Sequence, residues 1–108
     1  MASLKNKSDF DFVFKKNNLK ISSGEFTVLL VFKNKKEINY GFIFPKKNIH
    51  LAVNRNFAKR SAKEMLKTLN PKKGFDIVFL VNEKINNFDK DNVKKNFVEL
   101  KRKIEFCF

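Results

Sequence analysis

The spacing of apolar side chains along this 108-residue chain predicts a short helix first and three strands after it. Phe10, Val13 and Phe14 recur at the i, i+3, i+4 positions of one helical face. Ser8 and the acids directly after it form a reduced capping box, so Ser8 is predicted to open this helix. Lysines and asparagines at residues 15–18 end it.

Two longer runs rich in β-branched and aromatic residues follow, at residues 25–33 and 38–44. A polar turn joins them, which predicts that they pair as an antiparallel hairpin. A shorter strand at residues 21–23, ended by Gly24, precedes the hairpin. In the run at 38–44 the larger side chains alternate and share one face, namely Ile38, Tyr40, Phe42 and Phe44.

The second half of the chain predicts a helix, a strand and another helix. The first helix covers about residues 52–69 and ends at the Asn-Pro-Lys-Lys-Gly turn signal of residues 70–74. The apolar run at 75–81 is typical of a buried strand. After a loop at 82–88, Asp89 is predicted to cap the last helix. The packed face of that helix is predicted to hold Val93, Phe97, Leu100 and Ile104.

The element order α-β-β-β-α-β-α predicts a single-domain α+β sandwich over residues 1–108, with one sheet and helices packed on it. A chain of 108 residues suits one domain, and such a domain buries about two thirds of the surface of the unfolded chain. The 43% hydrophobic content and fourteen phenylalanines argue against intrinsic disorder.

The chain carries a formal net charge of +13, with an isoelectric point of about 10. Such an excess is typical of proteins that bind nucleic acid or, less often, anionic membranes. No apolar run approaches the ~20 residues that span a membrane, and the N-terminus lacks the apolar core of a signal peptide. Cys107 is the single cysteine, which excludes an intramolecular disulfide. We therefore expect a cytoplasmic protein with no membrane partner.

The charges cluster on the predicted helix at residues 52–69, which holds two of the three arginines. At about 100° per residue, its basic and amide side chains fall within one arc of roughly 140°, namely Arg55, Asn56, Lys59, Arg60, Lys63 and Lys67. The opposite side carries Ala58, Ala62, Met65, Leu66 and Leu69. A charge run is often only a solvated face, but like charges at i, i+4 repel one another. Only one acid, Glu64, interrupts them, so an external anion such as phosphate accounts for the arrangement.

The residue types of most catalytic and metal sites are scarce. His50 and Cys107 are the only residues of their kinds and belong to different segments, so neither a Cys/His dyad nor a zinc site is predicted. Asp9 and Asp11 lie two apart on a helix and do not converge. No catalytic residue, metal ligand or small-molecule substrate is expected. Basic side chains beside aromatic ones favour RNA over DNA, because unpaired bases stack on aromatic rings for about 1–3 kcal/mol each.

Three stretches resemble the bacterial ribonuclease P protein subunit, and together they span nearly the whole chain. Residues 9–14 are similar to the Asp-Phe-x-x-Val-Phe helix of that family, and residues 76–81 to its Asp-Ile-Val-Ile strand. The central stretch is similar to its Lys-Lys, Ala-Val-x-Arg-Asn-Arg-x-Lys-Arg and basic–acidic signature. It consists of Lys46-Lys47, Ala52-Val53-Asn54-Arg55-Asn56-Phe57-Ala58-Lys59-Arg60 and Lys63-Glu64.

This sequence departs from the family pattern at three places. Phe57 stands where the second arginine of the Arg-Asn-Arg core is expected. It either packs on a neighbouring loop or replaces an RNA contact with a stacking surface. The connection around His50 is one residue longer than usual, and Leu29 stands where a strand aromatic is often found.

The resemblance implies a left-handed βαβ crossover through the central helix, an exception to the right-handed rule. It also implies a ribonucleoprotein endoribonuclease in which the catalytic RNA of ribonuclease P removes the 5′ leader of precursor tRNA. The RNA would hold most of the Mg²⁺, and the protein alone is not expected to be catalytic. The residues that the resemblance assigns to RNA contacts are Lys46, Lys47, Arg55, Asn56, Lys59, Arg60 and Lys63.

A cleft between the N-terminal helix and the sheet is implied to hold the leader against Phe10 and Phe14. Simpler roles stay open for individual residues: solvated charge for the lysines, core packing for the two phenylalanines, and helix capping for Asn56. The functional role that competes with capping for Asn56 is a hydrogen bond to RNA or to a hydrated metal ion.

Three other functions would each account for part of this sequence pattern. A generic RNA-binding or ribosome-associated domain would share the charge and the aromatics. A DNA-binding regulator would use residues 52–69 as its recognition helix, but a strand and Pro45 stand where the partner helix should lie. A small metal-dependent nuclease would need convergent carboxylates, which the sequence does not predict.

Overall fold

The computed structural model describes residues 1–69 and 74–107. In chain order its elements are β1 (Ala2–Ser3), α1 (Lys7–Lys16), β2 (Leu19–Ser23), β3 (Phe26–Phe32), β4 (Ile38–Ile43), α2 (Ala52–Thr68), β5 (Phe75–Val81) and α3 (Lys90–Phe106). Apart from β1, this is the predicted order, and the ends of β3, β4 and α2 lie within one residue of the predicted ones. Residues 70–73 of the predicted turn lie outside the described residues.

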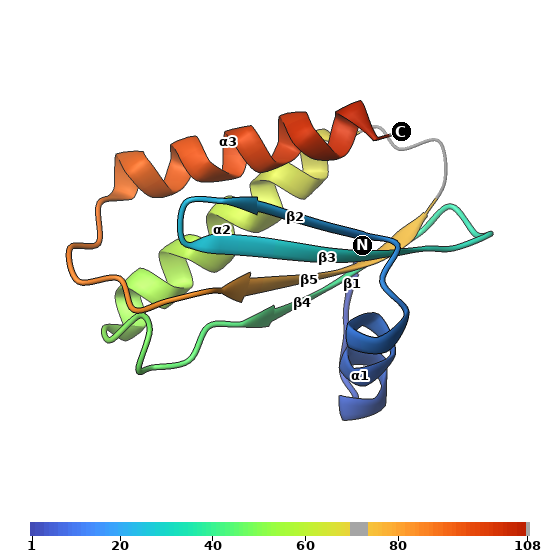
Figure 1. Cartoon of the computed structure of the whole chain (residues 1–108), viewed down its shortest axis with the longest axis horizontal. Coiled ribbons are helices and arrows are strands. Elements are labelled where there is room, and N and C mark those ends of the chain that lie inside the picture. Colours follow the sequence, from blue (N-terminus) through green and yellow to red (C-terminus); the bar gives the residue numbers. More distant parts are fainter. Residues whose placement is uncertain (70–73, 108) are drawn as a thin grey trace.

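The strands form one sheet in the order β1-β4-β5-β3-β2, so β5 lies at its centre (Figure 1). β5 runs parallel to β4, with Gly41 opposite Val78, and antiparallel to β3, with Val28 opposite Phe79. The predicted hairpin between β3 and β4 is therefore wrong, because β5 separates them. β5 is buried along nearly its whole length, and a strand with two apolar faces is most stable between two neighbours.

Helices cover both faces of the sheet: α2 and α3 lie on one face and α1 on the other (Figure 1). Under α2 and α3 is the larger core, where Phe97 contacts the rings of Phe26 and Phe79. Under α1 is a smaller core that joins Val13 to Val78. α2 connects the parallel strands β4 and β5 and so completes the expected βαβ crossover. The left-handed sense of that crossover stays a prediction.

The predicted packed faces of α2 and α3 are confirmed. The buried side chains are Ala58, Ala62, Met65, Leu66 and Leu69 at α2, and Val93, Phe97, Leu100 and Ile104 in α3. The cap of α3 is confirmed as well, because Asp89 Oδ1 accepts the N–H of Asp91 at 3.0 Å. Local periodicity was sufficient to orient both helices.

α1 begins one residue earlier than predicted, so Ser8 lies inside the helix and the predicted cap at Ser8 is wrong. Asn6 has the extended backbone of a cap residue (φ −105°, ψ 147°), and its carbonyl accepts the N–H of Asp9. The preceding chain is fixed by pairing with β4, where the N–H of Leu4 donates to the carbonyl of Tyr40 at 2.7 Å. This tertiary pairing, rather than the Ser8 side chain, determines where α1 starts.

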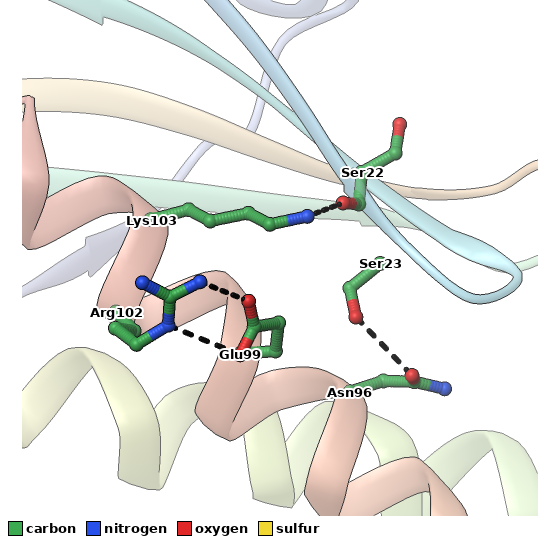
Figure 2. Close-up of polar contacts among 6 residues, drawn as sticks. All are labelled: Ser22, Ser23, Asn96, Glu99, Arg102 and Lys103. Carbon is green, nitrogen blue, oxygen red and sulfur yellow. Dashed lines mark hydrogen bonds and ion pairs between the residues drawn. The ribbon is translucent and has the colours of Figure 1, made fainter.

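α3 also holds the edge strand β2 (Figure 2). Ser23 Oγ donates to Asn96 Oδ1 at 3.2 Å, and Lys103 Nζ donates to the carbonyl of Ser22 at 2.8 Å. Gly24 turns the chain from β2 into β3 with a left-handed φ of 58°. A Cβ at this position would lie 2.6–2.9 Å from the Asn96 amide, so the turn and α3 are in tight contact.

Candidate nucleic-acid interface

The outer face of α2 carries the predicted cationic side chains. Asn56 and Arg60 are exposed, and Lys59 and Lys63 are half-buried. Among residues 1–69 and 74–107 the ion pairs join Lys33 to Glu37 and Asp76, and Arg102 to Glu99, so none involves α2. The basic side chains of α2 therefore form no ion pair within the described chain. They outnumber the one acid of the helix, Glu64, and are available to an external anion.

Arg55 has a structural role that the sequence did not indicate. Its Nη1 donates to the carbonyls of Ile49 and His50, both at 2.9 Å. Arg55 thus fixes the turn that leads into α2, while its other guanidinium nitrogens keep their donors. Contact between Arg55 and RNA stays a prediction.

Lys46 and Lys47 lie exposed in a short turn between β4 and α2. The carbonyl of Pro45 closes this turn by accepting the N–H groups of Asn48 and Ile49 at 2.9 and 3.0 Å. The side chain of Asn48 donates to the carbonyl of Val81 at 3.2 Å, which ties the turn to the end of β5. Both lysines therefore project from a well-anchored loop beside the N-terminus of α2.

Lys63 is held against the sheet by an aromatic ring. Its Nζ lies 5.5 Å from the ring centroid of Tyr40, within the range of a cation–π contact. Tyr40 belongs to β4, and its half-buried side chain lies on the α2 side of the sheet. Ile38, Phe42 and Phe44 lie on the same side, so the predicted common face of these four residues is confirmed. The cationic face of α2 therefore extends to β4.

Phe57 packs on a neighbouring loop, which is one of the two roles that the sequence left open. Its ring lies 6.1 Å from that of Phe88 at an interplanar angle of 86°. Lys90 and Lys94 Nζ lie 5.3 and 5.7 Å from the Phe57 centroid. These α3 lysines add positive charge beside Arg60, and no local pattern could have placed them there.

A shallow groove lies beside α1, on the other face of the sheet. Its walls are Lys7, Phe10, Asp11, Phe14 and Ile43. The Phe10 ring packs on Gly41, where a Cβ would come within 2.5 Å of it, so Phe10 is largely a packing residue. Phe14 is 43% exposed and forms the rim. The groove brings together the two predicted leader-binding phenylalanines, and the leader contact itself stays a prediction.

His50 and Cys107 occupy separate parts of the molecule, the turn before α2 and the end of α3. Within residues 1–69 and 74–107, no three His, Cys, Asp or Glu side chains come together as metal ligands. No helix in the same part of the chain is long and apolar enough to cross a bilayer. The segment before α2 is β4 and a turn, not the partner helix of a helix-turn-helix.

A family model described as Ribonuclease P matches residues 1–105. The chain belongs to the ribonuclease P protein family. It is 31% identical over 98 residues to the ribonuclease P protein component of Marinobacter nauticus, and the match covers 91% of this chain and 74% of that protein.

Two solved structures from this family share the fold. The RNase P protein of Staphylococcus aureus has a TM-score of 0.76 at 22% identity, and covers 94% of this chain and 93% of its own. The RNase P protein of Thermotoga maritima has a TM-score of 0.72 at 27% identity, and covers 95% and 97%. Family membership makes this chain a protein component of ribonuclease P, the ribonucleoprotein endoribonuclease of tRNA 5′ processing, which implies an RNA partner.

Proposed function

We propose that this chain binds the catalytic RNA of ribonuclease P through α2 and the turn before it, and the 5′ leader of precursor tRNA through the groove beside α1. The proposed contacts with the catalytic RNA are Lys46, Lys47, Arg55, Asn56, Lys59, Arg60 and Lys63. The observation that most directly supports the first assignment is the excess of basic side chains on α2, none of which forms an ion pair with a described acid.

In this proposal, bond cleavage occurs in the RNA, which would hold the Mg²⁺ ions; such ions would supply activation of water and charge stabilisation at the leaving oxygen. The assignment of the ion to the RNA follows the family resemblance. The protein neutralises phosphate charge and adds affinity for the substrate. Its effect on cleavage is therefore expected to be greatest at low Mg²⁺, where few ions neutralise the phosphates. Moderate rather than high salt is expected to suit it, because high salt weakens the contacts between the protein and the phosphates.

The leader assignment is supported by the position of Phe14. Its ring is 43% exposed at the rim of an apolar groove whose other side is Ile43 of β4. Lys7 lines the same groove and supplies a positive charge for the leader phosphates, which Asp11 offsets in part from the next turn of α1. An exposed ring beside a cation is the usual way in which proteins bind unpaired nucleotides.

The first experiment is reconstitution with bacterial ribonuclease P RNA and a 5′-extended precursor tRNA at low Mg²⁺. We expect mature 5′ ends to accumulate only when the protein is present. If both RNAs bind but cleavage does not rise, a generic RNA-binding role would replace the proposed one.

Phe14→Ala then tests the groove, with Phe12→Ala as the matched control. Phe12 lies on the same helix and is 52% exposed, but it does not line the groove. Loss of one stacked base costs about 1–3 kcal/mol, so Phe14→Ala should weaken binding of the precursor to the holoenzyme about tenfold. Binding of mature tRNA should not change. If the two variants weaken precursor binding equally, the proposal that the leader binds in this groove is rejected.

A further inference from the structure

A pocket of about 480 Å³ lies between the turn that follows β4 and the loop that follows β5. These strands are parallel, so both loops leave the sheet at the same end (Figure 1). The polar and aromatic side chains that line it are His50, Asn54, Asn86, Asn87 and Phe88. Its volume falls within the ~300–1,000 Å³ that is usual for ligand sites.

Hydrogen bonds to backbone carbonyls fix one wall of this pocket and join it to the other. Arg55 Nη1 holds the carbonyls of Ile49 and His50 in one wall. The carbonyl of Asn48 accepts the N–H of Ile85 at 2.9 Å, which joins the first wall to the second. A preformed pocket loses little conformational entropy when a ligand enters it.

Four polar side chains line the pocket. Within residues 1–69 and 74–107, the side chains of His50, Asn54, Asn86 and Asn87 make no hydrogen bond. Each amide offers a donor and an acceptor in one plane, which matches the edge of a nucleobase. Phe88 adds an aromatic surface, and its ring is held by contact with Phe57.

We infer that this pocket receives an unpaired nucleobase of the RNA that binds α2. The amides contact the hydrogen-bonding edge of the base, and the Phe88 ring supports its face. Asn54 belongs to α2, and the groove beside α1 lies on the opposite face of the sheet, so the base comes from the catalytic RNA rather than the leader. This inference rests on the function proposed above. It makes Arg55 a positioning residue for the pocket.

The test combines Asn86→Ala and Asn87→Ala in one variant. Both residues are exposed loop residues without internal hydrogen bonds in the described chain, so folding should be unaffected. The control is Asn34→Ala, an exposed amide in the turn between β3 and β4 at the other end of the sheet. Circular dichroism and thermal unfolding check that all three proteins are equally folded.

Affinity for ribonuclease P RNA is measured by filter binding. The accessibility of individual bases is measured with dimethyl sulfate and a carbodiimide, and that of the backbone with hydroxyl radicals. Loss of a bidentate amide contact should weaken binding about tenfold. One base protected in the wild-type complex should become reactive in the double variant, while backbone protection by α2 persists. Asn34→Ala should match the wild type.

Unchanged affinity together with an unchanged pattern of base protection would overturn the inference and leave the proposed function intact. A newly exposed base in the precursor leader, rather than in the catalytic RNA, would overturn the choice of RNA. Failure of the wild-type protein to protect any part of the catalytic RNA would instead reject the proposed function itself.

Discussion

Replacing Arg55 by alanine is predicted to destabilise the fold, whereas replacing Arg60 by alanine is not. Both arginines lie on α2, and both are assigned to RNA contacts by the family signature. Only Arg55 is bonded internally: its Nη1 joins the carbonyls of Ile49 and His50. Arg60 makes no hydrogen bond or ion pair with the residues that the structure describes. The two changes remove the same charge but different internal contacts.

The expected loss follows from the exposure of the two bonds. A hydrogen bond to a charged group contributes about 1.5–3 kcal/mol. The Arg55 bond to Ile49 is partly buried, but the bond to His50 is exposed, so water replaces most of the second. We therefore expect Arg55→Ala to lower the free energy of unfolding by about 2 kcal/mol. For a domain of this size that corresponds to a fall in Tm of roughly 8–12 °C.

Urea denaturation of the wild type and the two variants measures the difference directly, and filter binding measures their affinity for ribonuclease P RNA. Arg55→Lys serves as a third variant, because it keeps the charge but loses the planar donor group. It should be nearly as unstable as Arg55→Ala. If Arg55→Ala and Arg60→Ala unfold at the same urea concentration, the two carbonyl bonds contribute nothing and the reasoning fails.

Two further predictions concern stability alone. Gly24→Ala should lower Tm by several degrees without changing RNA affinity, because a left-handed φ costs a non-glycine residue about 1–2 kcal/mol and the new Cβ would meet Asn96; an unchanged Tm would contradict the tight contact. Burial lowers the pKa of Lys33, but its bonds with Asp76 and Glu37 outweigh this and raise the pKa above its ordinary value of 10.5. The pKa of Lys33 is higher in the folded chain than in the unfolded chain. Lys33 therefore contributes fully to the free energy of unfolding below pH 10.5, and this contribution is lost as the pH rises through the folded-state pKa. Chemical denaturation across this pH range should therefore show a larger loss of stability for the wild type than for Lys33→Met. Equal losses in the two proteins would refute a stabilising role for the Lys33 ion pairs.

Local patterns in the sequence predicted the elements and the two faces of α2, because both depend on periodicity within one segment. The strand order could not be predicted in this way. The turn between β3 and β4 indicates only that the chain reverses direction. β5, which begins more than thirty residues after β4, occupies the edges of β3 and β4 that a hairpin would have paired with each other. Burial of both faces of β5 favours its insertion between them.

In the candidate site as well, some features could be predicted from the sequence and others depend on contacts that form only in the folded chain. The charge of α2 follows from composition and spacing, and the family resemblance names the residues. The role of Arg55 depends on two backbone carbonyls in a turn, and side-chain patterns do not locate these. The position of Phe57 depends on its contact with Phe88. The additional positive charge beside Phe57 comes from Lys90 and Lys94 of α3. The contacts of Phe57 form only when the chain after β5 returns to α2.

β4 connects the two proposed RNA surfaces. On the α2 side, the ring of Tyr40 lies against Lys63, and on the α1 side, Ile43 and Gly41 contact the leader groove and Phe10. The carbonyl of Tyr40 also holds the segment that leads into α1. β4 is followed in the sheet only by the two-residue β1, so the two surfaces meet around a nearly open edge. An RNA complex that occupies both surfaces is therefore expected to pass around this edge.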